Sequence, residues 1–288
     1  MAGQNYIDQI DDSTFALTEY SRALGNPQFN HIFTFGSRLI SPLFANFPKF
    51  AKETNYQNPT ELMKSNFQSA FGAEETCFGR FKDDPELGTA FNDSMMNFAI
   101  SKTSWTDIYP TDDIVANSKP DHALVVDVGG GVGHDIERFR SRHPDVPNGS
   151  LILQDLPEVA ESAAVQAPVI TQAHDFMTPE PVKGARVYFL HNILHDWPEE
   201  QSAEILRNVA KGMQKGYSRI LLNENVIAAR GAHPLATMMD MCMMMLFSSV
   251  ERTERQWRQL IARVPELKLV KIWTAPQAVE SVLELELA

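Results

Sequence analysis

The feature that most constrains this chain is a short apolar strand that runs directly into a glycine-rich loop. Residues 124–134 read LVVDVGGGVGH, and the stretch that follows has the pattern of a helix. Glycines permit a tight turn and let a ligand approach the backbone closely. The start of the following helix leaves backbone N–H groups without intrahelical partners. A plain strand-to-helix turn needs one or two glycines, whereas four stand within five residues here, so the loop predicts a nucleotide site.

The spacing of these glycines does not match the dinucleotide fingerprint G-x-G-x-x-G. Its last glycine falls on His134 when the pattern is aligned from Gly129, and on Ile136 when it is aligned from Gly131. An acid instead precedes the loop, and we predict cofactor contacts from Asp127, Gly129, Gly130 and Gly131. An acid at this position disfavours an anionic pyrophosphate. It suits a cationic ligand such as S-adenosylmethionine (SAM), which carries a sulfonium and an amino group.

From about residue 121 onward, short apolar runs alternate with amphipathic stretches. This rhythm predicts an α/β domain over residues 121–288, with a mostly parallel sheet of the doubly wound kind. The predicted strands are 123–128, 150–154, 169–173, 185–191, 219–223, 269–274 and 282–287. The predicted helices are 132–142, 157–165, 199–215, 234–247 and 254–263. The last two strands are too close in sequence for a helical crossover, so we expect an antiparallel hairpin at one edge of the sheet.

Residues 1–120 show helical periodicity without alternating strands. We expect a helix over residues 31–50 that is broken at Pro42 and Pro48, a helix start at Pro59, and another helix over residues 85–104. Residues 107–120 are polar and bounded by proline, which predicts a linker between the two regions.

The net charge of −12 and the absence of a basic stripe argue against a nucleic-acid partner. The polar, acidic N-terminus does not resemble a signal peptide, and the most apolar run, 238–247, is too short to span a bilayer. Cys77 and Cys242 form neither a metal pattern nor a disulfide framework, which favours a reducing, cytoplasmic location.

Acidic side chains end the next two predicted strands. Asp155 could accept both ribose hydroxyls of a nucleoside, and Asp175, followed by Phe176, could contact an adenine amino group and ring. Each acid could instead simply cap a helix. Because ligands bind at the carboxyl edge of such sheets, the succession of acids at this edge favours a binding site.

A histidine follows the fourth predicted strand, in the segment Leu194-His195-Asp196. Imidazole is well matched to take a proton from a hydroxyl group at neutral pH, so we predict His195 as a general base. The alternative is a buried histidine that bonds to the backbone. His191 lies four residues earlier, but the two histidines straddle a strand end and no third ligand is evident, which argues against a metal site.

Two glutamates are candidates for orienting this base through its second ring nitrogen, as carboxylates commonly do. Glu224 follows the fifth strand, and Glu251 precedes a helix, where it could instead serve capping together with Thr253. The methionine-rich segment 238–247 lies between them. It is either core or an adaptable apolar wall for an aromatic substrate.

Five sequence blocks, in order, resemble the plant-type and fungal small-molecule O-methyltransferases that include the caffeate and flavonoid enzymes. They are DVGGGVGHD at 127–135, QDLP at 154–157, LHDWP at 194–198, ERTE at 251–254 and VKIW at 270–273. The resemblance implies a class I, seven-stranded, SAM-dependent methyltransferase and a homodimer held by the helical residues 1–120, which also cover the substrate. It implies a cofactor site lined by Gly129, Asp155, Leu156, Asp175 and Phe176, with S-adenosylhomocysteine (SAH) as product. It also implies His195 as base between Glu224 and Glu251, without a metal.

The chain departs from this family at two places. A winged-helix segment usually precedes the part seen here, and the lysine that plant members carry four residues before the base is His191. We expect methyl transfer to a hydroxyl of an aromatic or polyketide-like small molecule of fungal secondary metabolism. Two alternatives remain open at this point: a SAM-binding, pericyclase-like enzyme that does not methylate, and a non-catalytic partner subunit of a full-length methyltransferase.

Overall fold

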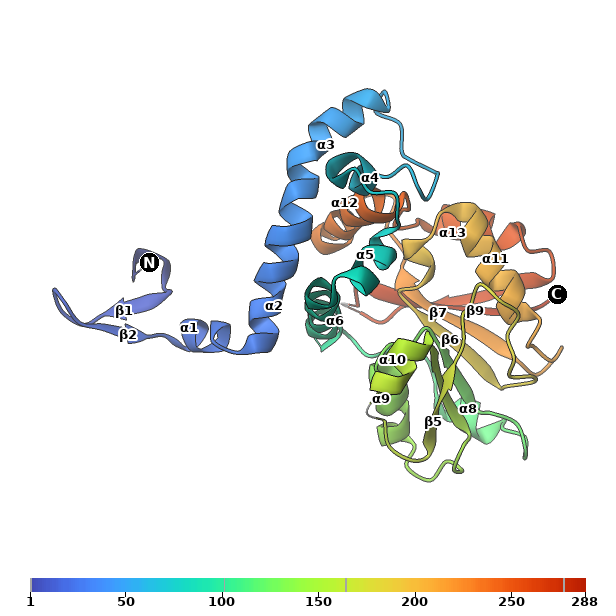
Figure 1. Ribbon diagram of the computed structural model, residues 1–288. Coiled ribbons are helices and arrows are strands. Elements are labelled where there is room, and N and C mark those ends of the chain that lie inside the picture. The colour runs from blue at the N-terminus through green and yellow to red at the C-terminus, as the bar shows by residue number, and fades with distance from the viewer. Residues whose placement is uncertain (1, 101, 164, 277) are drawn as a thin grey trace. The chain divides into compact units, whose positions relative to one another are not determined.

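The computed structural model describes residues 2–100, 102–163, 165–276 and 278–288, and the chain folds into two compact units (Figure 1). One unit is helical and consists of Met1–Gln57 and Asn66–Ser101. The other contains the large sheet and consists of Asn58–Ser65 and Lys102–Ala288.

The large sheet has seven strands in the order β5-β4-β3-β6-β7-β9-β8. The strands are β3 (Val125–Val128), β4 (Leu151–Asp155), β5 (Val169–Ala173), β6 (Val187–His191), β7 (Arg219–Asn225), β8 (Leu267–Trp273) and β9 (Glu280–Leu287). The first five pair in parallel, whereas β9 pairs antiparallel with both β7 and β8. This confirms the predicted α/β sheet and its terminal hairpin. Every strand of the sheet lies within two residues of its predicted bounds at each end.

Helices cover both faces of this sheet because neighbouring residues of each buried strand point to opposite sides. The helices are α7 (Trp105–Ile108), α8 (Asp112–Ala116), α9 (His134–Arg142), α10 (Pro157–Ser162), α11 (Glu199–Ala210), α12 (Pro234–Phe247) and α13 (Glu254–Ala262), with a 3-10 turn η3 at Leu194–Asp196. Val126 packs on the side of α11 and α13. Its neighbour Val125 packs on the side of α7 and α9.

The expected linker over residues 107–120 is wrong. The segment forms the end of α7 and all of α8, and its apolar residues Ile108, Tyr109 and Ile114 are buried in the core of the sheet unit. The preceding Trp105 is 1% exposed and stacks on Phe189 of β6 with ring centroids 4.4 Å apart. Polar residues on the exposed sides of these short helices gave the segment its linker-like composition.

The helical unit opens with a 3-10 turn η1 (Ala2–Gln4) and a small hairpin, β1 (Ile7–Gln9) and β2 (Phe15–Leu17), followed by helices. The helices are α1 (Glu19–Leu24), α2 (Pro27–Phe35), a π-helical turn η2 (Gly36–Ile40), α3 (Ser41–Glu53), α4 (Asn66–Phe71), α5 (Cys77–Asp83) and α6 (Pro85–Ile100). Packing of α2 on α6 and of α3 on α4 forms the core of this unit. The predicted end of α6 at residue 104 runs past Ser101, which lies outside the described residues.

Two expectations for the helical region are wrong. Pro42 does not break the helix: the backbone stays helical from α2 through the π-helical turn η2 into α3, and α3 also continues through Pro48. No helix begins at Pro59, since residues 58–65 form turns. These residues belong to the sheet unit, where Ser65 Oγ donates a hydrogen bond to the Leu246 carbonyl at 3.2 Å. Within the described parts of the chain, none of the helices has the length and apolarity to cross a membrane.

The burial of Trp105 generates a stability prediction. Trp105→Ala should lower the free energy of unfolding by about 3–5 kcal/mol, because the indole is enclosed between Phe139 and Phe189 and its removal leaves a cavity. Urea unfolding followed by circular dichroism measures the loss. Met238→Ala, at a helical position that is 46% exposed, is the control and should change stability little. A Trp105 variant as stable as the control would contradict the packing described here.

Candidate active site

The loop between β3 and α9 is held against the carboxyl end of β4. The N–H groups of Gly129 and Gly130 both donate to the Gln154 carbonyl, at 2.8 and 3.0 Å. Gly129, Gly131 and Gly133 adopt positive φ values of 71°, 60° and 92°, a region in which a side chain is strained. The glycine pattern is therefore required by the backbone of this loop.

The glycines also create close approaches. A Cβ atom on Gly129 would stand 2.7 Å from Ile193 Cδ1 and 3.2 Å from Phe176 Cε1. Segments following β3, β5 and β6 thus meet at this one position. At Gly131, by contrast, a Cβ atom would meet nothing within 4 Å, so the outer part of the loop faces open space.

Asp127 lies underneath the loop and is 1% exposed. A Cβ atom on Gly130 would stand 2.5 Å from its carboxyl carbon, so the absence of a side chain there makes room for the acid. Burial raises the pKa of Asp127 well above its usual value, and its Oδ2 has no hydrogen-bond partner. Asp127 therefore packs against the buried side of the glycine loop. A direct contact with a cofactor remains a prediction for this residue.

Asp155 holds the loop from the neighbouring strand. Its Oδ2 accepts a hydrogen bond from the Gly131 N–H at 2.8 Å, and its Oδ1 accepts one from the Leu156 N–H at 2.7 Å. Burial raises the pKa of this carboxyl group. Leu156 is 49% exposed although it is apolar, and it stands next to this acid at the sheet edge.

The segment after β5 lies at the same edge. Asp175 is exposed and accepts a hydrogen bond from the Met177 N–H at 2.9 Å, while the partly buried Phe176 ring meets Trp197 edge-on at 6.0 Å. Open backbone at Gly131, the Asp155 carboxylate, an exposed Leu156 and the Phe176 ring together fit a nucleoside with a cationic tail. The individual cofactor contacts of these residues remain predictions.

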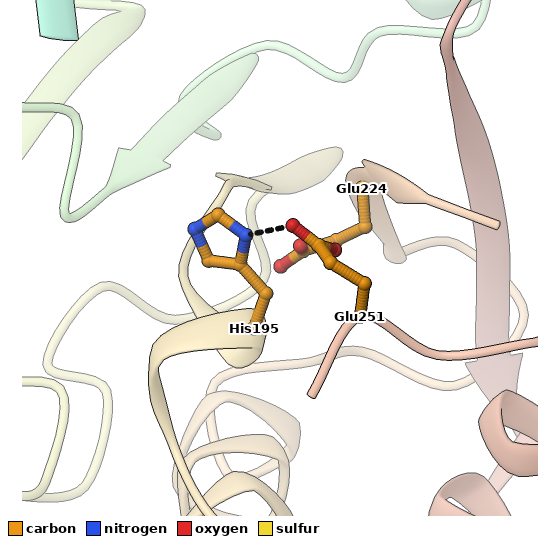
Figure 2. Close-up of side chains that lie close together, drawn as sticks. All are labelled: His195, Glu224 and Glu251. Atoms are coloured by element: carbon orange, nitrogen blue, oxygen red, sulfur yellow. Dashed lines mark hydrogen bonds and ion pairs between the residues drawn. The ribbon is translucent and has the colours of Figure 1, made fainter. Parts of the chain in front are cut away.

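The predicted base and both predicted glutamates converge at the carboxyl end of β6 and β7 (Figure 2). His195 lies in η3 and is 5% exposed, and its Nδ1 is 2.9 Å from Glu251 Oε1. Its Nε2 lies 3.4 Å from Asp196 Oδ1. Both ring nitrogens of His195 therefore face carboxylates. The alternative interpretation, a buried histidine whose ring bonds to the backbone, does not describe this side chain.

The two glutamates have different tasks. Glu251 orients the His195 ring, whereas Glu224 Oε1 accepts hydrogen bonds from the N–H groups of Ile193 and Leu194, at 3.0 and 2.8 Å. Glu224 thus fixes the backbone directly before His195. The alternative that Glu251 caps α13 does not hold, because Thr253 is the N-cap residue and forms a capping box with Gln256.

The surrounding charges set the protonation of His195. Burial lowers the pKa of His195, but the negative charges of Asp196 and Glu251 outweigh burial and raise this pKa to about 10. Burial raises the pKa of Asp196 to about 7, although the nearby His195 acts in the opposite direction. Any positive charge brought into this site opposes the protonated imidazole and thereby lowers the pKa of His195.

Sequence reasoning missed three residues that build this site. Asp196 faces the Nε2 side of the base, and Asp240 of α12 accepts a hydrogen bond from the Glu251 N–H at 2.9 Å. Arg252 is fully buried and donates to the Leu194 and Trp197 carbonyls, at 2.7 and 3.0 Å, on both sides of the base. Asp196 and Arg252 stand directly beside predicted residues, and adjacency was the one signal that could have found them.

Part of the methionine-rich helix α12 belongs to the core, and its role as an apolar wall for a substrate stays a prediction. Met243 and Met245 are buried, whereas Met238 is 46% exposed.

The second histidine of this segment, His191, lies in a separate cluster from His195. Its Nδ1 lies 2.6 Å from Asp135, and its Nε2 lies 3.1 Å from Glu280. The two histidines therefore do not share carboxylate partners.

The fold and this edge of the sheet define a class I methyltransferase. The O-methyltransferase domain family matches residues 54–264, and the chain belongs to this family. O-methyltransferase mfmE of Annulohypoxylon moriforme is 35% identical over 291 residues, which cover 100% of this chain and 71% of that protein. O-methyltransferase ATR12 of Stachybotrys chlorohalonatus is 39% identical over 244 residues, which cover 85% of this chain and 62% of that protein. The predicted family and enzyme class are thus confirmed.

Solved structures share the fold over the whole chain. LepI in complex with SAM superposes with a TM-score of 0.90 at 29% identity, covering 100% of this chain and 74% of that chain. A structure described as a pericyclic reaction enzyme gives a TM-score of 0.88 at 29% identity with the same coverage. LepI has also been solved with SAH and a substrate analogue. SAM as cofactor and SAH as product, both predicted from the sequence, agree with these structures.

The close approach at Gly129 generates a prediction for cofactor binding. Gly129→Ala should weaken SAM binding by at least about tenfold, or about 1.4 kcal/mol, because the added methyl group displaces Ile193 and Phe176. Isothermal titration calorimetry measures this affinity. Gly149→Ala is the matched control, since Gly149 has a similar positive φ of 74° but nothing within 4 Å of its Cβ position. Equal SAM affinity in both variants would show that the loop does not form the site.

Proposed function

We propose that this chain transfers a methyl group from SAM to a hydroxyl group of an aromatic or polyketide-like small molecule, with His195 as the general base. The observation that carries the proposal is the buried His195–Glu251 pair at the edge of the sheet where the glycine loop lies. Ile193, two residues before the base, lies against Gly129 of that loop. This contact supports a single site that contains both His195 and the predicted cofactor loop.

The cofactor, when bound, supplies an electrophilic methyl group. In this chain Asp155, Leu156, Asp175 and Phe176 would hold its nucleoside. A protonated phenol oxygen is a poor nucleophile, so its proton must leave as the new carbon–oxygen bond forms. Glu251 accepts the Nδ1 proton of His195, which leaves Nε2 as the atom that takes the hydroxyl proton.

The protonation state of His195 matters for this task. The ring must be neutral to accept a proton, whereas Asp196 and Glu251 favour its protonated form. A cationic ligand in the site acts against these carboxylates. The arrangement therefore supports a base that becomes competent when a positive charge is bound nearby.

Two features support an aromatic or polyketide-like acceptor. Helix α12 lies between Glu224 and Glu251 in sequence, contacts η3, and carries exposed and partly exposed methionines beside its buried ones. Flexible thioether side chains adapt to flat, irregular apolar ligands. The related fungal O-methyltransferases support a role in secondary metabolism.

A second candidate function is a pericyclic rearrangement assisted by a bound but unreacted cofactor. The 29% identity to a pericyclic reaction enzyme over the whole chain favours keeping it. The complete His195–Glu251 pair favours methyl transfer, because a rearrangement without proton loss does not need it. Mass spectrometry separates the two, since methylation adds fourteen daltons and yields SAH, whereas isomerisation does neither.

The assembly and location remain parts of the proposal. We propose a homodimer in which residues 1–120 contribute to dimerisation and cover the substrate, and a cytoplasmic location. Size-exclusion chromatography with light scattering tests the dimer. A chain that binds no SAM would instead support the alternative of a non-catalytic partner subunit.

The base role predicts the behaviour of two variants. His195→Ala and His195→Gln should both lower turnover of a phenolic acceptor by about 10²–10⁴-fold, because neither side chain can take the proton. Gln can still donate to Glu251, so it preserves the local packing. SAM affinity, measured by calorimetry, should change little in either variant. Turnover retained in the glutamine variant, or a carboxylate as the true acceptor, would remove the need for this base.

A further inference from the structure

The cluster around His195 has a property that base catalysis does not use. One ring nitrogen of His195 and one carboxylate oxygen each of Glu224 and Glu251 lie within 4.8 Å of one another, and all three residues are buried (Figure 2). Nδ1 is the ring nitrogen that contacts Glu251 Oε1, at 2.9 Å. In addition, the Oε2 atoms of Glu224 and Glu251 are buried without a hydrogen-bond partner. Buried carboxylate oxygens without partners are costly, and a cation relieves that cost.

The second buried histidine provides a contrast. His191 also lies between two carboxylates, but Asp135 is at its Nδ1 and Glu280 at its Nε2, on different sides of the ring. Those carboxylates are also paired with Arg138 and Lys102. They therefore cannot share one ion with His191. Among the described residues, His195, Glu224 and Glu251 are the three whose ligand atoms converge.

We propose that His195 Nδ1, Glu224 and Glu251 form a binding site for Zn²⁺. One imidazole nitrogen and two carboxylate oxygens are a ligand set that Zn²⁺ accepts, with bonds of about 2.0–2.2 Å and an open fourth position. Two carboxylates balance the charge of a divalent ion. Mg²⁺ and Ca²⁺ fit less well, because they prefer oxygen ligands and larger coordination numbers.

Zn²⁺ in this site inhibits the enzyme, a consequence that rests on the proposed function. An imidazole that binds a metal through Nδ1 carries its proton on Nε2. That nitrogen is the one proposed to accept the hydroxyl proton. The ion thus replaces the hydrogen bond between His195 and Glu251 and holds the ring in the tautomer that cannot act as a base.

Binding of Zn²⁺ is tested by calorimetry, in which ZnCl₂ is titrated into the metal-free full-length chain without SAM. We expect one ion per chain, and at least about tenfold weaker binding in Glu224→Gln. Glu180→Gln is the matched control, because Glu180 is equally buried but lies in a separate network with Gln154. Circular dichroism checks that each variant is folded. Absence of binding to the unmodified chain, or equal binding in both variants, would overturn the site.

The proposed tautomer of Zn²⁺-bound His195 is tested by NMR of ¹⁵N-labelled histidine rings. The His195 signals are identified by their loss in His195→Gln. A Zn²⁺-bound Nδ1 and a protonated Nε2 are expected, and coordination through Nε2 would refute the mechanism. With an accepted phenol, Zn²⁺ should abolish methylation and EDTA should restore it. Undiminished methylation by the Zn²⁺-bound chain would also refute it. A chain that binds Zn²⁺ but methylates no acceptor would retain the metal site while the proposed function fails.

Discussion

The architecture of the cofactor edge depends on hydrogen bonds between the glycine loop and the end of β4. The Gln154 carbonyl accepts from Gly129 and Gly130, and the Asp155 carboxylate accepts from Gly131. These bonds turn the chain out of β3 and set the start of α9. Because Phe176 and Ile193 lie against the same loop, the segments after β5 and β6 take their places relative to it. His195, two residues after Ile193, is thereby placed through backbone geometry.

Much of the sheet could be predicted because its central parallel strands β3, β4, β6 and β7 are buried on both faces, and their apolar residues stand in short continuous runs. The first third of the chain was harder. Pro42 was expected to break a helix that in fact continues from α2 through η2 into α3, and residues 58–65 form turns where a helix was expected. Trp105 and Ile114 are core residues in short helices, and their polar neighbours concealed them. Short elements that gain stability from tertiary packing leave little periodic signal.

Residues of the candidate site could be predicted where a polar or ionisable side chain follows the end of a strand. Glu251 was ambiguous from sequence alone, and its bond to His195 became visible only once residues 56 positions apart in the chain were brought together. Asp240 and Arg252 were missed for the same reason. Arg252, for example, forms its hydrogen bonds with backbone carbonyls, and no sequence pattern encodes carbonyl positions.

The placement of β9 between β7 and β8 has a consequence for folding. Glu280, at the start of β9, reaches His191 and Asn223, and His191 in turn reaches Asp135 in the first turn of α9. The strand β9 therefore inserts between two strands that precede it in sequence, and its first residue connects that part of the sheet to the helix that follows the glycine loop. A chain in which β9 has not yet joined the sheet lacks these hydrogen bonds.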